Sequence, residues 1–238
     1  MAEPRIRVLI VDDQPLFASG LELQIAAQAD LECVGVAYDG REAIALVDSV
    51  RPDVVLMDLR MPGMNGVDAT AAITGAGVRA QAANGPSGSG KAGDCASVPK
   101  VVVLTTIRRD EAVFHALRAG ASAFLTKDAT PAVLLGTIRG VHSGLDLTDP
   151  ESSLDVIQEF ARPAAVADAP DPLAPLSVRE REVFGLLTRG LSNAEVASTL
   201  FLSEATVKSH VQAILQKLQL RGRVQLVIFA YESGLAAV

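Results

Sequence analysis

The sequence predicts a doubly wound α/β domain with a parallel sheet, followed by a separate and smaller all-helical module. Three observations predict this architecture. Residues 5–141 alternate short runs of Val, Ile and Leu with amphipathic stretches, as parallel strands covered by helices do. Residues 173–238 carry helical patterns only, with serines at helix-capping spacing. An acidic stretch separates the two parts, and 238 residues suit about two domains.

The expected strands of the first domain lack regular polar alternation, so both of their faces should be buried. They are expected over Arg5–Val11, Leu31–Ala37, Asp53–Met57, Lys100–Thr105 and Ala123–Leu125. The intervening helices are expected over Pro15–Ala29, Gly40–Val50, Gly66–Thr74, Asp110–Ala119 and Pro131–Val141. Such sheets bind their ligands at the carboxyl ends of the strands.

One stretch of the first domain, residues 75–98, departs from this pattern. It contains six glycines and no aromatic residue, Ile or Leu, so it can bury too little apolar surface to offset the entropy of ordering it. We expect a flexible insertion there. The run Gly85–Ala92 resembles a phosphate-binding loop, but Ala92 replaces the Ser or Thr that would ligate Mg²⁺, and the run is interpreted as linker.

Charge divides the rest of the chain. Residues 142–172 hold one basic and seven acidic residues and several prolines, and we expect an acidic linker with one short helix near Leu154–Phe160. Residues 173–238 hold seven basic and five acidic residues, although the whole chain has a net charge of −7. The last part is therefore the one suited to a polyanionic partner.

Five side chains are expected to converge at the carboxyl edge of the sheet. Asp12 and Asp13 follow the first strand, Asp58 follows the third, Thr105 ends the fourth and Lys127 follows the fifth. Clustered carboxylates repel unless a cation compensates them, and Mg²⁺ prefers oxygen ligands. A carboxylate beside Mg²⁺ can attack a phosphoryl group to form an acyl phosphate, whose oxygens an ammonium and a hydroxyl can hold. Any single Asp of this set would equally serve as a turn or capping residue.

Four runs at this edge resemble the bacterial response-regulator receiver domain. They are Val11-Asp12-Asp13, Leu56-Met57-Asp58-Leu59-Arg60-Met61-Pro62-Gly63-Met64-Asn65-Gly66, Leu104-Thr105-Thr106 and Ala123-Phe124-Leu125-Thr126-Lys127-Asp128. The resemblance covers residues 5–141 and implies a flavodoxin-like, doubly wound (βα)5 fold for a receiver domain spanning residues 1–141.

The same resemblance implies a role for each residue. Asp58 would be the phosphoacceptor. The Mg²⁺ ligands would be Asp12, Asp13, Asp58 and the backbone carbonyl of Arg60. The phosphate partner, the switch hydroxyl and the switch aromatic residue would be Lys127, Thr105 and Phe124, although a Phe in a short strand is as often an ordinary core residue.

Four helices are expected in residues 173–238: Val178–Arg189, Asn193–Leu200, Glu204–Leu218 and Arg223–Ser233. The short connection between the second and third is typical of a helix-turn-helix. The third helix has an apolar stripe and an opposite face with Lys208, Ser209 and Gln212, which suits the DNA major groove but is equally typical of a solvated helix face. Arg221 and Arg223 are expected to contact backbone phosphates.

Three runs of this module resemble the LuxR-type helix-turn-helix. They are Leu176-Ser177-Val178-Arg179-Glu180-Arg181-Glu182-Val183, Gly190-Leu191-Ser192-Asn193-Ala194-Glu195-Val196-Ala197 and Leu202-Ser203-Glu204-Ala205-Thr206-Val207-Lys208-Ser209-His210-Val211. The resemblance covers residues 174–235 and implies Lys208, Ser209 and Gln212 as groove contacts and Thr206 as a phosphate contact. With the receiver-like part, the whole chain is similar to the NarL/FixJ class of response regulators.

This class implies a two-component response regulator and not an enzyme. A cognate sensor histidine kinase would phosphorylate Asp58, and phosphorylation would control binding to double-stranded DNA and transcription, with a homodimer forming in the phosphorylated state. Two alternatives stay open. A Mg²⁺-dependent phosphatase would need a second Asp where this chain has Arg60, and a receiver without phosphate response would leave DNA binding constitutive.

Cysteine usage and hydropathy predict the compartment. The two cysteines, Cys33 and Cys95, are far apart in the sequence, and neither a basic leader nor a run of 18 apolar residues is present. We therefore expect a cytoplasmic protein without membrane association.

Overall fold

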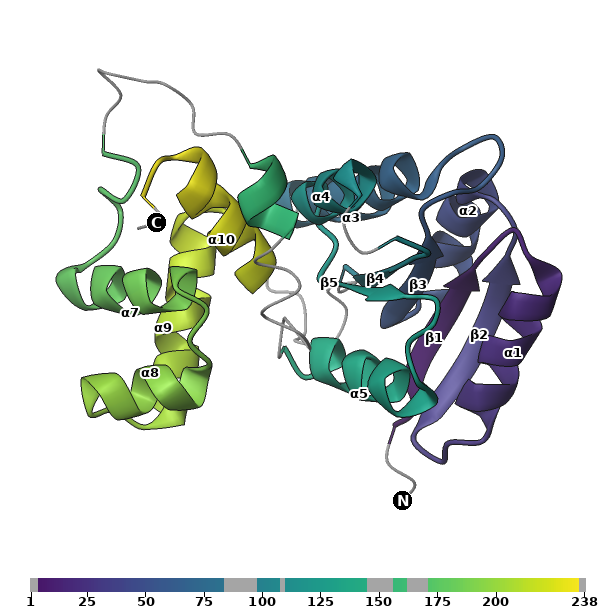
Figure 1. The fold of residues 1–238 in the computed structure, drawn as a ribbon, viewed down its shortest axis with the longest axis horizontal. Coiled ribbons are helices and arrows are strands. Elements are labelled where there is room, and N and C mark those ends of the chain that lie inside the picture. Colours follow the sequence, from purple (N-terminus) through teal and green to yellow (C-terminus); the bar gives the residue numbers. More distant parts are fainter. Residues whose placement is uncertain (1–3, 84–97, 108–109, 145–155, 162–170, 236–238) are drawn as a thin grey trace. The chain divides into compact units, whose positions relative to one another are not determined.

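The computed structural model describes residues 4–83, 98–107, 110–144, 156–161 and 171–235 (Figure 1). The chain divides into two compact units, Met1–Thr148 and Asp149–Val238. The division falls inside the expected linker, residues 142–172. The first unit includes residues beyond the expected domain end at 141, and the second unit begins inside the expected linker.

The first unit contains a five-stranded parallel sheet with the strand order β2-β1-β3-β4-β5. Its strands are β1 (Ile6–Val11), β2 (Leu31–Ala37), β3 (Val54–Asp58), β4 (Lys100–Thr105) and β5 (Ala123–Thr126). Its helices are α1 (Pro15–Ala26), α2 (Gly40–Val50), α3 (Gly66–Ala83), α4 (Glu111–Arg118) and α5 (Pro131–His142). The order reverses after β1, as in a flavodoxin-like doubly wound sheet, so the predicted fold is confirmed.

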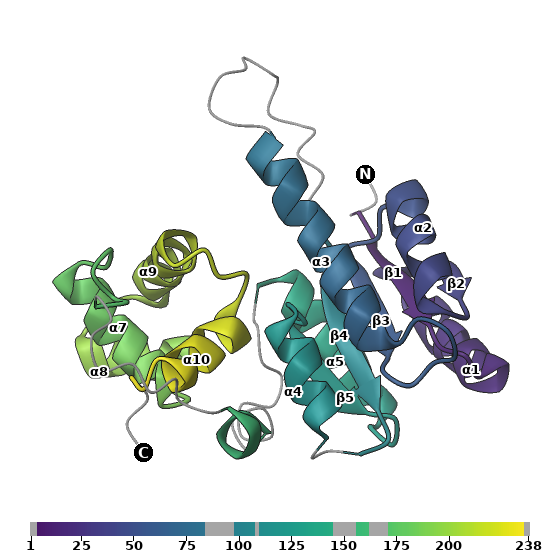
Figure 2. The same cartoon turned by 90° about the horizontal axis from the view of Figure 1, so that it is seen from above.

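Helices cover both faces of this sheet. Figures 1 and 2 show α1 and α5 on one face and α2, α3 and α4 on the other. The α1 and α5 face forms one apolar cluster with alternate residues of the strands, among them Ile10, Leu56 and Leu104. The neighbouring residues Val11, Met57 and Val103 are equally buried, which explains why the strand sequences show no polar alternation.

The expected end of the third helix at Thr74 is wrong. Helix α3 continues to Ala83, and Figure 2 shows its last turns extending beyond the neighbouring helices of the unit. Residues 76–83 are rich in alanine, and adding such residues to an existing helix avoids the cost of nucleation. The expected flexible insertion 75–98 thus begins with helix, and its part 84–97, including Gly85–Ala92, lies outside the described residues.

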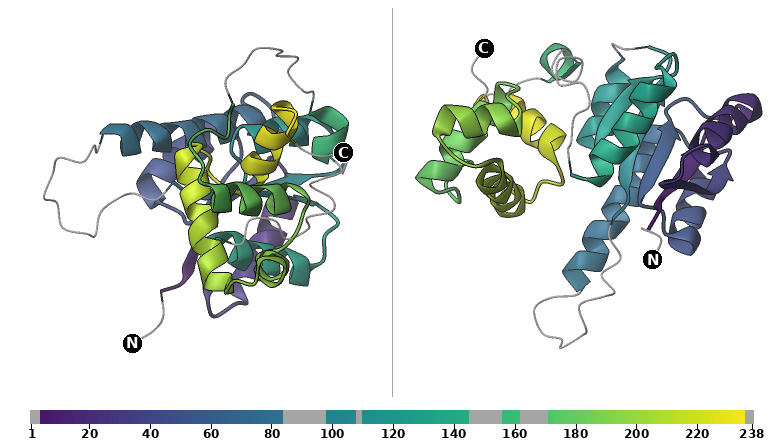
Figure 3. Two further views of the ribbon diagram at one scale, coloured as in Figure 1. Left: turned by 90° about the vertical axis from the view of Figure 1, so that its left-hand side faces the viewer. Right: turned by 90° about the horizontal axis from the view of Figure 1, so that it is seen from below.

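The second unit consists of helices, as predicted. They are α7 (Val178–Thr188), α8 (Asn193–Leu200), α9 (Glu204–Lys217) and α10 (Arg223–Glu232), and α9 crosses α7 and α8 (Figure 3). Ser177 and Ser192 form complete capping boxes, and Ser203 caps α9 by accepting from the Thr206 amide. The expected helix ends are therefore set by local hydrogen bonds.

A short helix over residues 156–160 confirms the helix expected inside the linker. It belongs to the second unit, where the Gln158 amide donates to the Tyr231 hydroxyl at 2.9 Å. Val156 and Ile157 are buried, so this segment is packed rather than a plain spacer.

Candidate functional site

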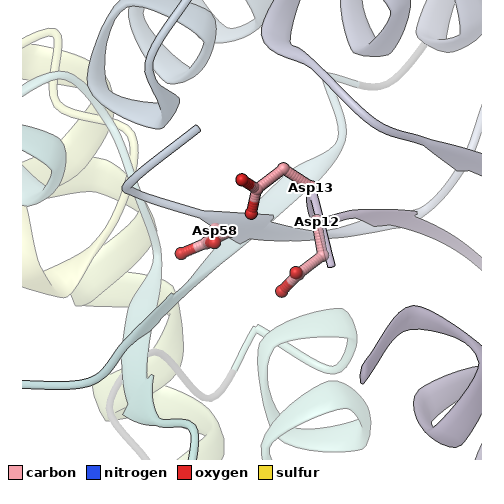
Figure 4. Close-up of side chains that lie close together, drawn as sticks. All are labelled: Asp12, Asp13 and Asp58. Atoms are coloured by element: carbon pink, nitrogen blue, oxygen red, sulfur yellow. The ribbon is translucent and has the colours of Figure 1, made fainter. Parts of the chain in front are cut away.

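Three carboxylates meet at the carboxyl edge of the sheet. Asp58 is the last residue of β3, and Asp12 and Asp13 follow β1, its neighbour in the sheet. One oxygen of each lies within 4.8 Å of the others, and Figure 4 shows the three side chains gathered at the ends of these two strands. The structure thus brings together the acidic residues that the sequence predicts.

Lys127 is the cation of this acidic pocket. It follows β5, and its Nζ lies 2.7 Å from Asp12 Oδ2 and 2.8 Å from Asp58 Oδ2. The ammonium also lies 4.8 Å from the centre of the Phe17 ring, a favourable cation–π arrangement. Because the lysine side chain is only 11% exposed, these pairs are shielded from water and are stronger than surface ion pairs.

Burial and neighbouring charges shift the pKa values of Asp58 and Lys127 in opposite directions. Burial raises the pKa of Asp58 above the ordinary aspartate range, and the hydrogen bond from Lys127 only partly offsets it. For Lys127, burial alone would lower the pKa, but the hydrogen bonds to Asp12 and Asp58 hold it above its usual value. Lys127 therefore stays charged, and the pocket keeps an excess of negative charge for a second cation to neutralise.

The donor set fits a magnesium ion. The buried Oδ1 of Asp13 has no hydrogen-bond partner within the described part of the chain, and such an oxygen is costly unless a cation binds it. The three clustered acids offer carboxylate oxygens, which are ligands that Mg²⁺ prefers. The Asp12 carboxylate is oriented by the backbone, since its Oδ1 accepts from the Gln14 amide at 2.9 Å.

Close backbone packing fixes the position of Asp58. A Cβ on Gly66 would lie only 2.0 Å from the Asp58 carbonyl oxygen, so the start of α3 can approach β3 this closely only with glycine. The Leu59 amide donates to the Leu104 carbonyl at 3.2 Å, and the Gly66 amide donates to the Leu59 carbonyl at 3.1 Å. The Arg60 amide then reaches Asp58 Oδ1 at 3.3 Å.

Thr105 lies on β4, the strand next to that of Asp58, and Phe124 lies on β5, one strand farther along the sheet. Thr105 is buried at the end of β4, where its hydroxyl exchanges hydrogen bonds of 3.2 Å with the backbone of Ile107. The Lys127 amide donates to the Thr105 carbonyl at 2.7 Å. Phe124 is buried in β5, the environment of an ordinary core residue, and its switch role stays a prediction.

One ion pair at this edge was not predicted from the sequence. The Arg60 guanidinium lies 2.6 Å from Asp110 Oδ2, and Asp110 also caps α4 by accepting from the Ala112 amide at 3.0 Å. This pair raises the pKa of Arg60 and lowers the pKa of Asp110. The two residues are far apart in sequence. The sequence signals were therefore limited to an arginine near Asp58 and an aspartate just before a helix.

The second unit exposes the predicted polar face of α9. Thr206, Lys208, Ser209 and Gln212 are all exposed. The opposite face packs in the core, where Val207 and Ile214 are fully buried. The structure therefore gives α9 one surface that is free for a partner, as the helix-turn-helix prediction requires.

Of the two arginines after α9, Arg223 differs from expectation. Arg223 is only 9% exposed, and its guanidinium donates to the Leu191 carbonyl within the unit. It is therefore committed to holding α10 against the α7–α8 connection, and the phosphate contact predicted for it is not supported. Arg221 is partly buried, and burial lowers its pKa. Its predicted contact with a phosphate remains a prediction.

Comparison with known proteins decides the family. Residues 8–82 match the response regulator receiver domain, and residues 174–230 match the luxR family of bacterial regulatory proteins. The chain is 36% identical to the uncharacterized transcriptional regulatory protein YxjL of Bacillus subtilis, over 99% of both chains. It is 32% identical to the response regulator protein VraR of Staphylococcus aureus, over 97% of this chain and 98% of VraR.

This chain is a LuxR-type response regulator. A solved two-component response regulator of the LuxR family from Aurantimonas sp. SI85-9A1 agrees, with 26% identity, a TM-score of 0.52, and coverage of 66% of this chain and 99% of its own. The receiver match ends at residue 82, before Thr105 and Lys127. In this response regulator it is therefore the fold that brings Lys127 to Asp58.

Among the described helices of this response regulator, none combines the length and the hydropathy that crossing a membrane requires.

Proposed function

We propose that Asp58 is the residue of this response regulator that carries the phosphoryl group. The observation that carries the proposal is the ion pair of 2.8 Å between Lys127 and Asp58, set among three clustered carboxylates. Asp58 is only 4% exposed but lies at an open edge of the sheet, where α/β proteins bind their ligands. Burial raises the pKa of this carboxyl, and acids perturbed in this way cluster at functional sites.

The reaction is a phosphoryl transfer from a sensor histidine kinase. An Asp58 carboxylate oxygen attacks phosphorus of the kinase phosphohistidine, the P–N bond breaks, and the freed imidazole takes up a proton. Lys127, now paired with Asp58, then has a phosphoryl oxygen within reach. Thr105, whose hydroxyl contacts its own loop, is the second donor for that group.

The residues that would hold Mg²⁺ are Asp12, Asp13, Asp58 and the backbone carbonyl of Arg60. When bound, the ion neutralises the carboxylates and the incoming phosphoryl oxygens. The chain's own part is to hold these oxygens together: the Gln14 amide orients Asp12, and the Arg60 amide orients Asp58. We assign no independent enzymatic turnover to the protein, because Arg60 stands where a phosphatase of this chemistry needs a second acid.

Labelling of the full chain tests the phosphoacceptor. The protein is incubated with acetyl phosphate and Mg²⁺, and the phosphorylated fraction is measured by intact-protein mass spectrometry. Asp58→Asn should abolish the added phosphate, and chelation with EDTA should abolish it in the wild type. The matched control is Asp53→Asn, which should label normally. Asp53 directly precedes β3, and its carboxylate accepts a hydrogen bond from the Arg7 amide. Full labelling of Asp58→Asn would overturn the assignment.

The output of this switch is DNA binding by α9. We assign Lys208, Ser209 and Gln212 to the major groove and Thr206 and Arg221 to backbone phosphates of double-stranded DNA, because the first four share the exposed face of one helix. Phosphorylation adds roughly two negative charges at Asp58 and, in this proposal, favours a homodimer that binds two half-sites in the cytoplasm.

A further inference from the structure

Phe201 has two properties that the packing of its own unit does not explain. It ends α8 in the left-handed conformation, with φ 55° and ψ 45°. Its side chain is 95% exposed, the largest exposed fraction among the large apolar residues that the structure describes. A Cβ is crowded in this conformation, so glycine or asparagine usually occupies the position. Stability alone would therefore favour a different residue.

Two other residues of the described chain share this backbone conformation without glycine, and both are polar. Arg51 ends α2 with φ 45°, and Gln219 follows α9 with φ 55°. Both are exposed, and a polar side chain loses nothing by facing water. Phe201 instead combines backbone strain with a hydrated aromatic ring, and strain of this kind is commonly kept where a residue serves binding.

The turn that carries Phe201 is held firmly in place. Its neighbours Leu200 and Leu202 pack into the core of the unit. The Leu202 amide donates to the Ala197 carbonyl at 2.9 Å, and the Arg179 guanidinium donates to the Leu200 carbonyl at 2.7 Å. The ring is therefore projected outward by a turn whose two flanking side chains point inward.

This turn leads directly into the surface assigned to DNA. Two residues after Phe201, Ser203 caps α9 and its hydroxyl lies 2.8 Å from the Thr206 hydroxyl. Both residues are exposed, as is Lys208 in the next turn. The DNA backbone alternates anionic phosphates with apolar deoxyribose faces, and the surface offers hydroxyls and an ammonium beside one aromatic ring. The chemistry of the two surfaces is complementary.

We propose that Phe201 is a DNA-binding residue whose ring packs on the deoxyribose next to the phosphate contacted by Thr206. This inference rests on the proposed DNA binding by α9. The contact is apolar, so it strengthens binding without releasing counterions. It also explains why a strained aromatic residue occupies a position that glycine or asparagine would fill at lower cost.

The test separates an apolar contact from an ionic one. The full-length protein, activated with beryllofluoride, selects a 30-bp duplex from a random pool, and fluorescence anisotropy then gives Kd between 50 and 200 mM salt. Phe201→Asn should weaken binding about tenfold and leave the slope of log Kd against log salt unchanged. Phe201→Tyr, which keeps the flat ring, should bind within about twofold of the wild type.

A thermal control shows that strain has been relieved. Phe201→Asn should raise Tm by about 1–3 °C, since asparagine tolerates the left-handed conformation. Arg51→Asn is the matched control: it changes a residue of the same conformation in the other unit, and it should leave Kd unchanged. A Phe201→Asn variant that is more stable and binds DNA more weakly is the expected result.

The experiment distinguishes failure of the Phe201 inference from failure of the proposed DNA binding. If Phe201→Asn binds as tightly as the wild type while Lys208→Ala binds more weakly, DNA binding by α9 stands and the role of Phe201 is overturned. If Phe201→Asn binds DNA normally but loses transcriptional activation in vitro, the ring contacts a protein, and the inference is again overturned. If no duplex is selected and Lys208→Ala changes nothing, the proposed DNA binding fails, and this inference fails with it.

Discussion

Replacing Gly66 by alanine should disable phosphorylation without touching any charged group of the pocket. A Cβ at this position would lie 2.0 Å from the Asp58 carbonyl oxygen and 2.9 Å from its carbonyl carbon. Ordinary van der Waals contact begins at 3.4 Å, so the end of β3 or the start of α3 must move by about 1 Å or more. The obstacle is backbone on both sides, and a rotamer change cannot relieve it.

A displacement of that size is large for phosphoryl transfer. Misplacing reacting groups by about 1 Å costs roughly 10²-fold in rate, and we expect this loss in the rate of phosphorylation of Gly66→Ala by acetyl phosphate. Overpacking should also lower the free energy of unfolding by about 1–3 kcal/mol. Rates are therefore measured at a temperature at which circular dichroism shows the variant to be folded.

Gly75 provides the matched control on the same helix. A Cβ there meets nothing within 4 Å, so Gly75→Ala should label at the wild-type rate and stabilise α3 by about 0.5–1 kcal/mol. A folded Gly66→Ala that is phosphorylated as fast as Gly75→Ala would refute the argument that this contact positions Asp58.

Three further outcomes follow from single contacts. Lys127→Ala should slow acetyl-phosphate labelling of Asp58 by roughly 10²-fold, measured by mass spectrometry, because a donor to the phosphoryl group is lost. Lys208→Ala should reduce the salt dependence of DNA binding by about one unit of slope, measured by anisotropy. Glu180→Gln should cost about 1 kcal/mol in urea unfolding, a modest value because its partner Lys217 is 40% exposed. Lys217 lowers the pKa of Glu180 to about 2, so this contribution is complete above the unfolded pKa near 4.5. The difference should vanish as pH falls from there through 2.

The fold was predictable because its signals are local. Apolar runs such as Val54–Met57 predict strands that are buried on both faces, and serine capping boxes define the starts of α7 and α8. The end of α3 was predicted wrongly, since the helix extends to Ala83. The prediction considered only how little apolar surface this glycine-containing stretch can bury. A helix that has already formed can continue through alanine-rich sequence without burying more surface.

The candidate site was predictable in part. Asp12, Asp13, Asp58 and Lys127 follow strands of one parallel sheet, so strand order alone brings them to a common edge. Other contacts depend on side-chain conformations that sequence spacing does not specify. Examples are the ion pair between Arg60 and Asp110 and the inward direction of the Arg223 side chain. An arginine beside a DNA-binding helix has the same sequence signature whether it contacts phosphate or a carbonyl of its own domain.

The contacts of Lys127 indicate how phosphorylation of Asp58 would affect the neighbouring strands of the sheet. Its ammonium is shared between Asp12 and Asp58, while its amide is bonded to the Thr105 carbonyl. Phosphorylation of one Asp58 oxygen to an acyl phosphate removes a partner of that ammonium and offers phosphoryl oxygens farther out. Lys127 must then re-pair, and the ends of β4 and β5 are joined at this point, so we expect the loops that follow both strands to respond together. The same lysine that holds the unphosphorylated arrangement would be redirected by phosphorylation, so we expect the edge of the sheet to switch between two discrete arrangements.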